Sequence, residues 1–475
     1  MSERQADLGV LGMGTMGANL ALNFADNGGF TVALGNRTVE KAYGVRDDNP
    51  ALAERLVPTD SIEHLVATLK SPRVVVIMVN AGKPVDDQIA LVLPHLAPGD
   101  ILIDAGNADF NDTVRRERAI KDSGVHFVGM GVSGGEEGAR HGPSIMVGGD
   151  QAVWQRLKPL LEPISAKFDG IPCVDWLGAD GAGHFVKTIH NGIEYADMQM
   201  IAEIYGILRD GIGLSAREMS DIFADWNTRG LQSYLVEITA VTLAEKDPET
   251  GKPLVDVIVD EAGQKGTGRW SVIEAQKLGV GATTLEAAVS ARGISSRRAE
   301  RAQAEALFGD IRTARAEFHA DHEGLGELEA ALETAKIIAY AQGYAVMSEA
   351  SREYGWNLPL GGIARIWRAG CIIRSRFLDD ITKAYEAGEV VNLLQSPHFA
   401  TRVREGQASL RRVVAKAALA GLPVPALSAA LAYFDDYRHA RGTTNLTQAQ
   451  RDLFGAHTFH RLDREGTFHH KWPQV

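Results

Sequence analysis

Five polar residues near the middle of the chain recur at the spacing of one helix face. Lys187, His190, Asn191, Glu194 and Tyr195 occupy positions i, i+3, i+4, i+7 and i+8. At about 100° per residue they lie within an arc of about 140°, which a globular protein normally uses for apolar packing. A solvated face with i,i+4 pairs is the alternative, but an imidazole and an amide add little to such pairing. The face therefore predicts a cleft in which a polar molecule is bound and converted.

A glycine-rich turn near the N-terminus predicts a dinucleotide site. The pattern GxGxxG at 12–17 follows the strand-like segment Leu8–Leu11 and opens a helical segment. Its glycines let a pyrophosphate approach the helix N-terminus, whose free N–H groups and dipole favour anions. The pattern alone is weak evidence, and its strand–turn–helix context is what favours a Rossmann-like unit. The expected contacts in this turn are Gly12, Gly14, Thr15, Met16 and Gly17.

The end of the second predicted strand distinguishes between the two nicotinamide cofactors. An NAD site usually has Asp or Glu about 20 residues after the glycine turn, where it holds the ribose hydroxyls. Here Phe30–Leu34 leads into Asn36, Arg37 and Thr38, with no carboxylate to repel a 2′-phosphate. Arg37 can bind that phosphate with two donors, so we expect NADP, the alternative being an exposed arginine in a surface turn. The remaining expected cofactor contacts are Val79 and Asn107.

Two further loops follow predicted strands at the edge where open α/β sheets bind ligands. One is Asp104–Asn107, after the strand Ile101–Ile103, and the other is Val132–Gly138, after Val125–Val128. Either loop alone could be a tight turn, but beside a dinucleotide site both favour substrate contacts. The groups expected to make these contacts are Asn107, Ser133, Gly134 and Gly135.

A second glycine-rich segment, Gly263–Trp270, brings cations and a hydroxyl together. Its backbone N–H groups can surround a phosphate together with Lys265 and Thr267. The GxxxxGK[ST] spacing is missing, so nucleotide hydrolysis is not supported. Further cationic candidates are Arg292, Arg451 and His457, each of which is equally compatible with a solvated surface position.

The composition limits the fold and the partners. A chain of 475 residues with 45% hydrophobic and 23% charged residues is typical of a globular protein of two or three domains. The formal net charge of −12 argues against a general nucleic-acid or acidic-membrane surface. Two isolated cysteines, Cys173 and Cys371, favour a reducing compartment and argue against a zinc site. With no signal-like N-terminus and no run of about 18 apolar residues, we expect a cytoplasmic protein that binds no metal.

The elements that must position these residues form two contrasting halves. The first 180 residues alternate strand-like runs with helical patterns, as in a doubly wound parallel sheet. The predicted strands are Leu8–Leu11, Phe30–Leu34, Arg73–Val79, Ile101–Ile103, Val125–Val128 and Ser144–Val147, separated by helices such as Met16–Asn27 and Thr113–Ser123. From Ala182 to about His439 the apolar pattern has the helical period, as in Glu327–Tyr354.

We therefore expect three parts. Residues 1–181 form an NADP-binding, Rossmann-like α/β domain, and residues 182–440 form an all-α domain for substrate binding. Residues 441–475 hold four histidines, at 457, 460, 469 and 470, and show little apolar periodicity. They are expected to be an extended tail that rests on an external surface.

Taken together, the motifs resemble one family, the decarboxylating 6-phosphogluconate dehydrogenases of the pentose phosphate pathway. The segments that carry the resemblance are NRT at 36–38, GVSGGEEGAR at 131–140, VKTIHNGIEYADMQ at 186–199, DEAGQKGTGRW at 260–270, GGIARIWRAGCIIR at 361–374 and QAQRDLFGAH at 448–457. They span nearly the whole chain and are together highly specific. Two positions depart from the pattern: Ala105 stands where the family usually has Gly, and Gly14 where Ala is common. Neither change removes a reacting group.

The resemblance implies that NADP+ oxidises 6-phospho-D-gluconate at C3, after which CO2 is lost and the enediol becomes D-ribulose 5-phosphate. Lys187 would act first as base and then as acid, and Glu194 would protonate C1. The groups that would orient the sugar acid are Asn107, Ser133, Gly134, Gly135, His190 and Asn191. The 6-phosphate would be held by Tyr195, Lys265, Thr267 and Arg292, joined by Arg451 and His457 from a neighbouring subunit of a homodimer.

Two other functions remain open from the sequence. One is a β-hydroxyacid dehydrogenase that acts on a small unphosphorylated 3-hydroxy acid, against which the phosphate segment and the tail argue. The other is a non-catalytic NADP-binding or scaffolding protein, against which the joint presence of Lys187 and Glu194 argues.

Overall fold

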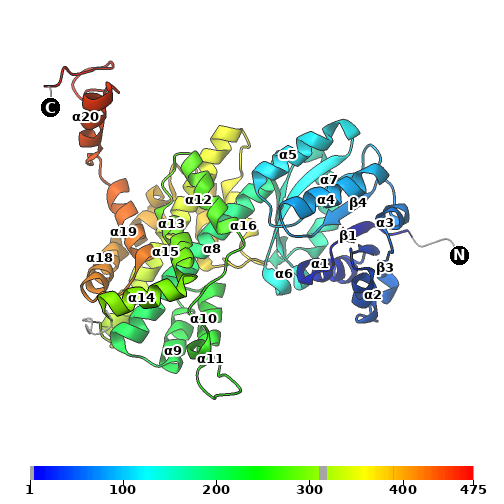
Figure 1. The fold of residues 1–475 in the computed structure, drawn as a ribbon, viewed down its shortest axis with the longest axis horizontal. Coiled ribbons are helices and arrows are strands. Elements are labelled where there is room, and N and C mark those ends of the chain that lie inside the picture. The colour runs from blue at the N-terminus through cyan, green and yellow to red at the C-terminus, as the bar shows by residue number, and fades with distance from the viewer. Residues whose placement is uncertain (1–4, 310–317, 389, 474–475) are drawn as a thin grey trace. The chain divides into compact units, whose positions relative to one another are not determined.

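The computed structural model describes residues 5–309, 318–388 and 390–473. The chain divides into two compact units, Met1–Ala430 and Leu431–Val475. In the first unit an N-terminal sheet precedes a long series of helices (Figure 1). Across the described ranges, no helix has both the length and the apolar character needed to cross a membrane.

An eight-stranded sheet forms the N-terminal part of the first unit. Its strands are β1 (Leu8–Leu11), β2 (Val32–Gly35), β3 (Leu56–Pro58), β4 (Val74–Ile77), β5 (Ile101–Asp104), β6 (His126–Ser133), β7 (Ser144–Gly148) and β10 (Val174–Gly178). The spatial order is β10-β7-β6-β5-β4-β1-β2-β3, and every pair is parallel except β6 with β7. The order reverses between β1 and β4, which is the point where open α/β sheets bind ligands.

Helices cover both faces of the sheet because successive strand residues point to opposite sides. Val10 and Val76 belong to one apolar cluster, whereas their neighbours Leu11 and Ile77 belong to another. The helices of this part are α1 (Thr15–Asp26), α2 (Val39–Asp47), α3 (Ile62–Thr68), α4 (Lys83–Val92), α5 (Phe110–Ile120), α6 (Gly135–His141) and α7 (Gln151–Ile164). The prediction of a doubly wound α/β sheet is therefore confirmed.

The sequence reading missed three strand segments. The edge strand β3 has only three residues and ends in a proline. The opposite edge strand, β10, contains a charged Asp175, so it lacks the continuous apolar run of the central strands. The third segment is the short antiparallel pair β8 (Lys167–Phe168) and β9 (Ile171–Pro172), whose two-residue strands are too short to show a period.

The remainder of the first unit is helical, as predicted. Its helices are α8 (Ala182–Gly206), α9 (Ala216–Trp226), α10 (Tyr234–Ala244), α11 (Leu254–Val257), α12 (Thr267–Lys277), α13 (Thr283–Ser295), α14 (Arg298–Phe308), α15 (His322–Tyr354), α16 (Leu360–Ile366), α17 (Arg376–Glu386), α18 (Pro397–Leu419) and α19 (Pro425–Tyr437). Helix α8 is central because it packs against α12, α13 and α15 and also against β6 and β7. The predicted boundary at 181/182 falls between β10 and α8, while the two compact units divide within α19. The three-part division itself stays a prediction.

The second unit departs from the expected extended tail. It contains helix α20 (Thr444–Gly455), so the prediction is wrong for these residues. The buried carboxylate of Asp452 accepts hydrogen bonds from the backbone N–H of Thr458, at 2.9 Å, and of His470, at 3.0 Å. The indole of Trp472 donates to it as well, at 2.8 Å. A polar centre folds this segment back on its helix, and apolar periodicity gives no sign of such a centre.

Candidate active site

Helix α8 lies directly on the sheet because glycines line the contact. A β-carbon added to Gly131 of β6 would lie 2.6 Å from the β-carbon of Lys187. A β-carbon added to Gly183 would lie 2.5 Å from the carbonyl oxygen of Met146 in β7. The close approach brings Lys187 to the end of β6, where Ser133 is the last residue of the strand.

The five polar residues predicted to share a face do lie on α8, and most are buried. Lys187, His190, Asn191 and Tyr195 are 0–7% exposed, and the side chain of Glu194 is 19% exposed. The amine of Lys187 donates to Asn191 Oδ1 at 2.6 Å. The amide of Asn191 in turn donates to Thr267 Oγ1 at 2.9 Å, so the helix is joined to the second glycine-rich segment.

The imidazole of His190 connects α8 to the end of β6. Its Nε2 lies 3.3 Å from Ser133 Oγ, and its Nδ1 lies 3.1 Å from Asn191 Oδ1. Nδ1 is also 3.8 Å from a carboxylate oxygen of Glu194. The ring of Trp367 meets the imidazole edge to face, with centroids 5.3 Å apart. These contacts hold the ring in one orientation.

Burial shifts the ionisation of three of these groups. Desolvation lowers the pKa of Lys187, against the opposing attraction of Glu194. Desolvation raises the pKa of Glu194, against the opposing effects of Lys187 and Arg292. The pKa of His190 is held well below its ordinary value by burial and by the nearby Lys187. Burial therefore shifts the pKa values of Lys187 and Glu194 in the directions that favour their uncharged forms.

The predicted phosphate contacts of the first unit gather at the C-terminal side of this face. A β-carbon added to Gly268 would lie 2.4 Å from the ring of Tyr195, so the N-terminus of α12 packs on that ring. The guanidinium of Arg292, from α13, lies 3.4 Å from the centroid of the same ring. Thr267 is buried, and Lys265 is exposed two residues before it. Backbone groups, a hydroxyl and the guanidinium of Arg292 thus meet beside the polar face.

A cavity of about 620 Å³ lies at the β1–β4 switch point. Of the predicted cofactor residues, its lining includes Gly12, Asn36, Arg37, Thr38 and Val79. The sequence reading missed the contribution of Asn80 and of Pro84, Asp87 and Gln88 on α4. These residues follow β4, and only the strand order shows that their loop adjoins the glycine turn.

The cavity and the glycine turn have the features that a dinucleotide requires. Gly12 has a φ of 103°, and a β-carbon there would lie 2.3 Å from the carbonyl oxygen of Met78. A β-carbon on Gly14 would meet no atom within 4 Å, so the space above the start of α1, which opens with Thr15 and Met16, is open. The first turn of α1 has no acidic residue and no side-chain cap, so its N–H groups can bind a phosphate. Gly17 is needed for packing, since a β-carbon would lie 1.8 Å from Gly12 O.

The other predicted residues lie just beyond β5, just beyond β6 and in the second unit. Asn107 is exposed just beyond β5. Gly134 and Gly135 have φ values of 112° and 64°, and a β-carbon on Gly134 would lie 2.6 Å from the carbonyl oxygen of Gly370. Arg451 and His457 are exposed in the second unit.

Sequence reasoning missed two residues that support the site. Trp367 packs on His190, and Gly370 packs on Gly134. Both belong to the segment 361–374, which carries part of the family resemblance but holds no predicted site residue. Their roles depend on contacts with residues far away in the chain, so no local pattern could have revealed them.

Known proteins share this arrangement over almost the whole chain. Residues 183–472 match the 6-phosphogluconate dehydrogenase C-terminal domain, and residues 7–178 match the NAD binding domain of 6-phosphogluconate dehydrogenase. The chain is 49% identical to the NADP(+)-dependent, decarboxylating 6-phosphogluconate dehydrogenase of Bacillus subtilis, over 99% of this chain and 100% of the relative. It is also 49% identical to the decarboxylating 6-phosphogluconate dehydrogenase of Synechococcus elongatus, over 98% of both chains.

A solved structure agrees with these relatives. The chain is similar to 6-phosphogluconate dehydrogenase of Plasmodium falciparum, which was solved in its apo form, with NADP+ and with 6-phosphogluconate. The TM-score is 0.93 at 40% identity, over 98% of this chain and 100% of that one.

Proposed function

The chain belongs to the 6-phosphogluconate dehydrogenase family, and from that premise we propose how its residues perform the reaction. The activity is the oxidative decarboxylation of 6-phospho-D-gluconate to D-ribulose 5-phosphate and CO2, with reduction of NADP+ to NADPH. When bound, NADP+ supplies the hydride acceptor. Arg37 would hold its 2′-phosphate, and the N-terminus of α1 beside Gly14 would hold its pyrophosphate.

Lys187 is the proposed base for the oxidation. Its lowered pKa favours the free amine, which can take the C3 hydroxyl proton as hydride leaves C3. The product is a β-keto acid, whose C–CO2 bond breaks when negative charge can collect on the keto oxygen. The ammonium group that Lys187 has just become can donate a hydrogen bond to that oxygen. Asn191 Oδ1 accepts a hydrogen bond from the amine at 2.6 Å and so would orient it for both steps.

Glu194 is the proposed acid for the last step. Its raised pKa favours the protonated form, which can deliver a proton to C1 of the enediol. His190 is buried and favours its neutral form, so it suits a role in orienting hydroxyl groups together with Ser133. Asn107, Gly134 and Gly135 would bind the carboxylate end of the substrate from the sheet edge.

Tyr195, Lys265, Thr267 and Arg292 would bind the 6-phosphate. We further propose that the enzyme is a homodimer in the cytoplasm, in which Arg451 and His457 of a second copy complete the phosphate site. The separate compact unit Leu431–Val475 and the exposure of both residues support this arrangement. A chain with a net charge of −12 needs such a local cluster of cations to bind an anionic substrate.

One observation carries the catalytic proposal: the hydrogen bonds from Lys187 to Asn191 and from Asn191 to Thr267. They join the base on α8 to the segment that would bind the phosphate, so one substrate can contact both. A small unphosphorylated acid would leave the segment that would bind the phosphate without a ligand.

The test is an NADPH absorbance assay with 6-phosphogluconate, run beside NAD+ as oxidant and beside 3-hydroxyisobutyrate as substrate. We expect equal amounts of NADPH and CO2 from 6-phosphogluconate and a much slower reaction with NAD+. NADPH formation from 3-hydroxyisobutyrate, with none from 6-phosphogluconate, would contradict the proposed substrate.

A further inference from the structure

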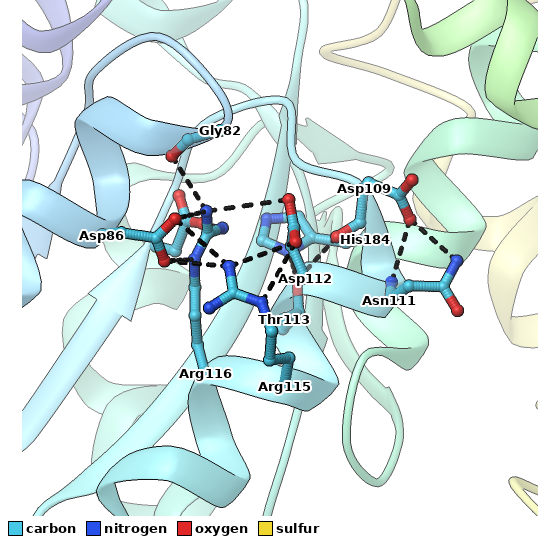
Figure 2. A network of polar contacts seen from close by, with 10 residues as sticks. Gly82, Asp86, Asp109, Asn111, Asp112, Thr113, Arg115, Arg116 and His184 are labelled. Carbon is cyan, nitrogen blue, oxygen red and sulfur yellow. Dashed lines mark hydrogen bonds and ion pairs between the residues drawn. The ribbon is translucent and has the colours of Figure 1, made fainter.

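Helix α5 carries a buried arginine that the mechanism does not use. The side chain of Arg116 is 1% exposed, and each end of its guanidinium has a partner. Nε donates to Asp86 Oδ1 at 2.8 Å, and Nη2 donates to the carbonyl oxygen of Gly82 at 2.9 Å (Figure 2). Nη1 donates to Asp104 Oδ2 at 3.3 Å. One planar group therefore joins three segments of the chain.

One of these segments borders the cofactor cavity, and another leads to Asn107. Gly82 and Asp86 lie at the start of α4, immediately after the loop that contributes Val79 and Asn80 to the cavity lining. Asp104 is the fully buried last residue of β5, and its Oδ1 accepts the N–H of Gly106 at 3.1 Å. Arg116 thus holds both the loop that lines the cavity and the loop that leads to Asn107.

The two loops also touch each other. A β-carbon on Gly106 would lie 3.0 Å from the carbonyl oxygen of Val79. A shift of either loop must therefore move the other, and the buried charges of Arg116 and Asp104 resist such a shift.

The same helix reaches α8 one turn earlier. Thr113 Oγ1 lies 2.7 Å from Nδ1 of His184. His184 is buried on α8, one turn before Lys187. Between them lies Gly129 of β6, where a β-carbon would be 2.6 Å from the methyl group of Thr113 and 2.8 Å from His184 Nδ1. The missing side chain at this strand position is what allows α5 and α8 to meet.

We propose that Thr113 and Arg116 are positioning residues, through which α5 sets the separation between the cofactor edge and the helix that carries Lys187. The inference rests on the proposed cofactor site and base. Hydride transfer requires the reacting atoms to be about 3–3.5 Å apart, and a displacement of about 1 Å costs about 10²-fold in rate. Neither residue contacts the reacting groups, so both act through the loops and through His184.

The proposed role of Arg116 at the cofactor cavity is tested with Arg116→Lys. A single ammonium group cannot reach Asp86, Gly82 and Asp104 together, so we expect the NADP+ dissociation constant of the folded protein to rise about tenfold. Binding of 6-phosphogluconate to the cofactor-free protein should weaken less than NADP+ binding, because among its proposed contacts in the first unit only Asn107 lies in a loop that Arg116 holds. Both constants are measured by titration of intrinsic fluorescence.

Arg115→Lys is the matched control. Arg115 is the neighbouring residue, is 54% exposed, and binds Asp86 at 3.0 Å and Asp112 at 3.1 Å from the outer side (Figure 2). The Arg115→Lys variant should keep the wild-type NADP+ affinity. Equal weakening of NADP+ binding in both variants, or equal weakening of cofactor and substrate binding in Arg116→Lys, would show a purely structural role and overturn the inference.

The proposed contact between Thr113 and His184 of α8 is tested with Thr113→Val, which removes the hydroxyl group and keeps the shape of the side chain. We expect the affinities for NADP+ and 6-phosphogluconate to be unchanged and kcat to fall about tenfold. The isotope effect with substrate deuterated at C3 should increase, because hydride transfer becomes slower relative to product release. A wild-type kcat and isotope effect in this variant would overturn the inference that α5 sets the separation between the cofactor edge and α8. A wild-type NADP+ affinity in Arg116→Lys would overturn it as well. Failure of the wild-type protein itself to bind NADP+ would instead contradict the proposed function.

Discussion

Lys187 and Glu194 lie two turns apart on one helix, and burial moves their pKa values in opposite directions. Desolvation penalises the charged form of each group, so the amine tends to lose its proton and the carboxyl group tends to keep its own. The mutual attraction of the charged forms acts against both shifts and is the smaller effect at each group. These two shifted groups provide the base and the acid that the proposed reaction needs.

Replacement of the proposed base separates chemistry from binding. In Lys187→Ala we expect kcat to fall by about 10²–10⁴-fold, because the variant lacks the proposed general base. Binding of 6-phosphogluconate and of NADP+ should be largely kept, as measured by titration. Appreciable turnover in the variant would argue against the role of this residue as base.

The pH dependence follows from the directions of the two pKa shifts. Activity should be lost at low pH because Lys187 is then protonated, and its lowered pKa extends the active range of the free amine to lower pH. Activity should also be lost at high pH because Glu194 is then ionised, and its raised pKa extends the active range of the protonated carboxyl group to higher pH. A profile of kcat against pH measures both limbs, because kcat includes the protonation of C1 that follows the loss of CO2. The alkaline limb should be absent in Glu194→Gln, and its persistence there would assign it to another group.

We propose that cofactor choice depends on one exposed side chain, Arg37. Arg37→Asp places a negative charge where the 2′-phosphate would bind, so the KM for NADP+ should rise by about 10²-fold or more. The KM for NAD+, which has no such phosphate, serves as the matched control and should change little. Equal losses with both cofactors would refute the assignment of Arg37.

At the scale of elements, the site depends on how closely α8 approaches β6. Gly131, Gly148 and Gly183 have no side chains to separate the helix from the strands, and a β-carbon on Gly183 would lie 2.6 Å from the backbone nitrogen of Gly148. Lys187 therefore owes its position beside Ser133 to glycines that carry no chemistry.

Gly131→Ala tests this packing. The added methyl group would meet the β-carbon of Lys187 at 2.6 Å, so we expect a loss of about 1–3 kcal/mol in unfolding free energy and a lower kcat, with NADP+ binding kept. Gly206→Ala, at the last residue of the same helix, is the matched control. A β-carbon there meets no atom within 4 Å, so this variant should be neutral or slightly stabilising in thermal unfolding. Comparable kcat losses in both variants would contradict the packing argument.

At the scale of the whole molecule, the C-terminal unit is the part whose proposed role needs a second copy. It is a compact unit of its own, and it carries the exposed Arg451 and His457. Two units joined by a single helix, α19, are compatible with exchange of the tail between subunits.

Truncation after His439 leaves α19 complete and removes α20. We expect the KM for 6-phosphogluconate to rise and the dimer to be lost, while NADP+ binding stays, because the cofactor cavity lies on the sheet. Sedimentation analysis and substrate titration measure these effects. Arg451→Ala in the full chain is the control that should weaken substrate binding without dissociating the dimer. A monomeric, fully active truncation would refute the shared site.

The sequence by itself determined the features that one element contains. The polar face of α8, the glycine turn at 12–17 and the missing carboxylate at 36–38 depend only on the local backbone period, so spacing was sufficient to predict them. The central strands were found for the same reason, because buried parallel strands read as continuous apolar runs. Edge strand β3 was missed because it is short, and α20 because a buried carboxylate rather than an apolar stripe organises it.

Tertiary structure alone decided which distant residues meet. Asn191 bonds to Thr267 across 76 positions, and Trp367 packs on His190 from a segment to which the sequence assigned no role. The pKa shifts belong to the same class, because desolvation depends on everything that packs around a group. Contacts of this kind follow from the strand order and from the packing of α8 on the sheet, neither of which is encoded in any single stretch of the chain.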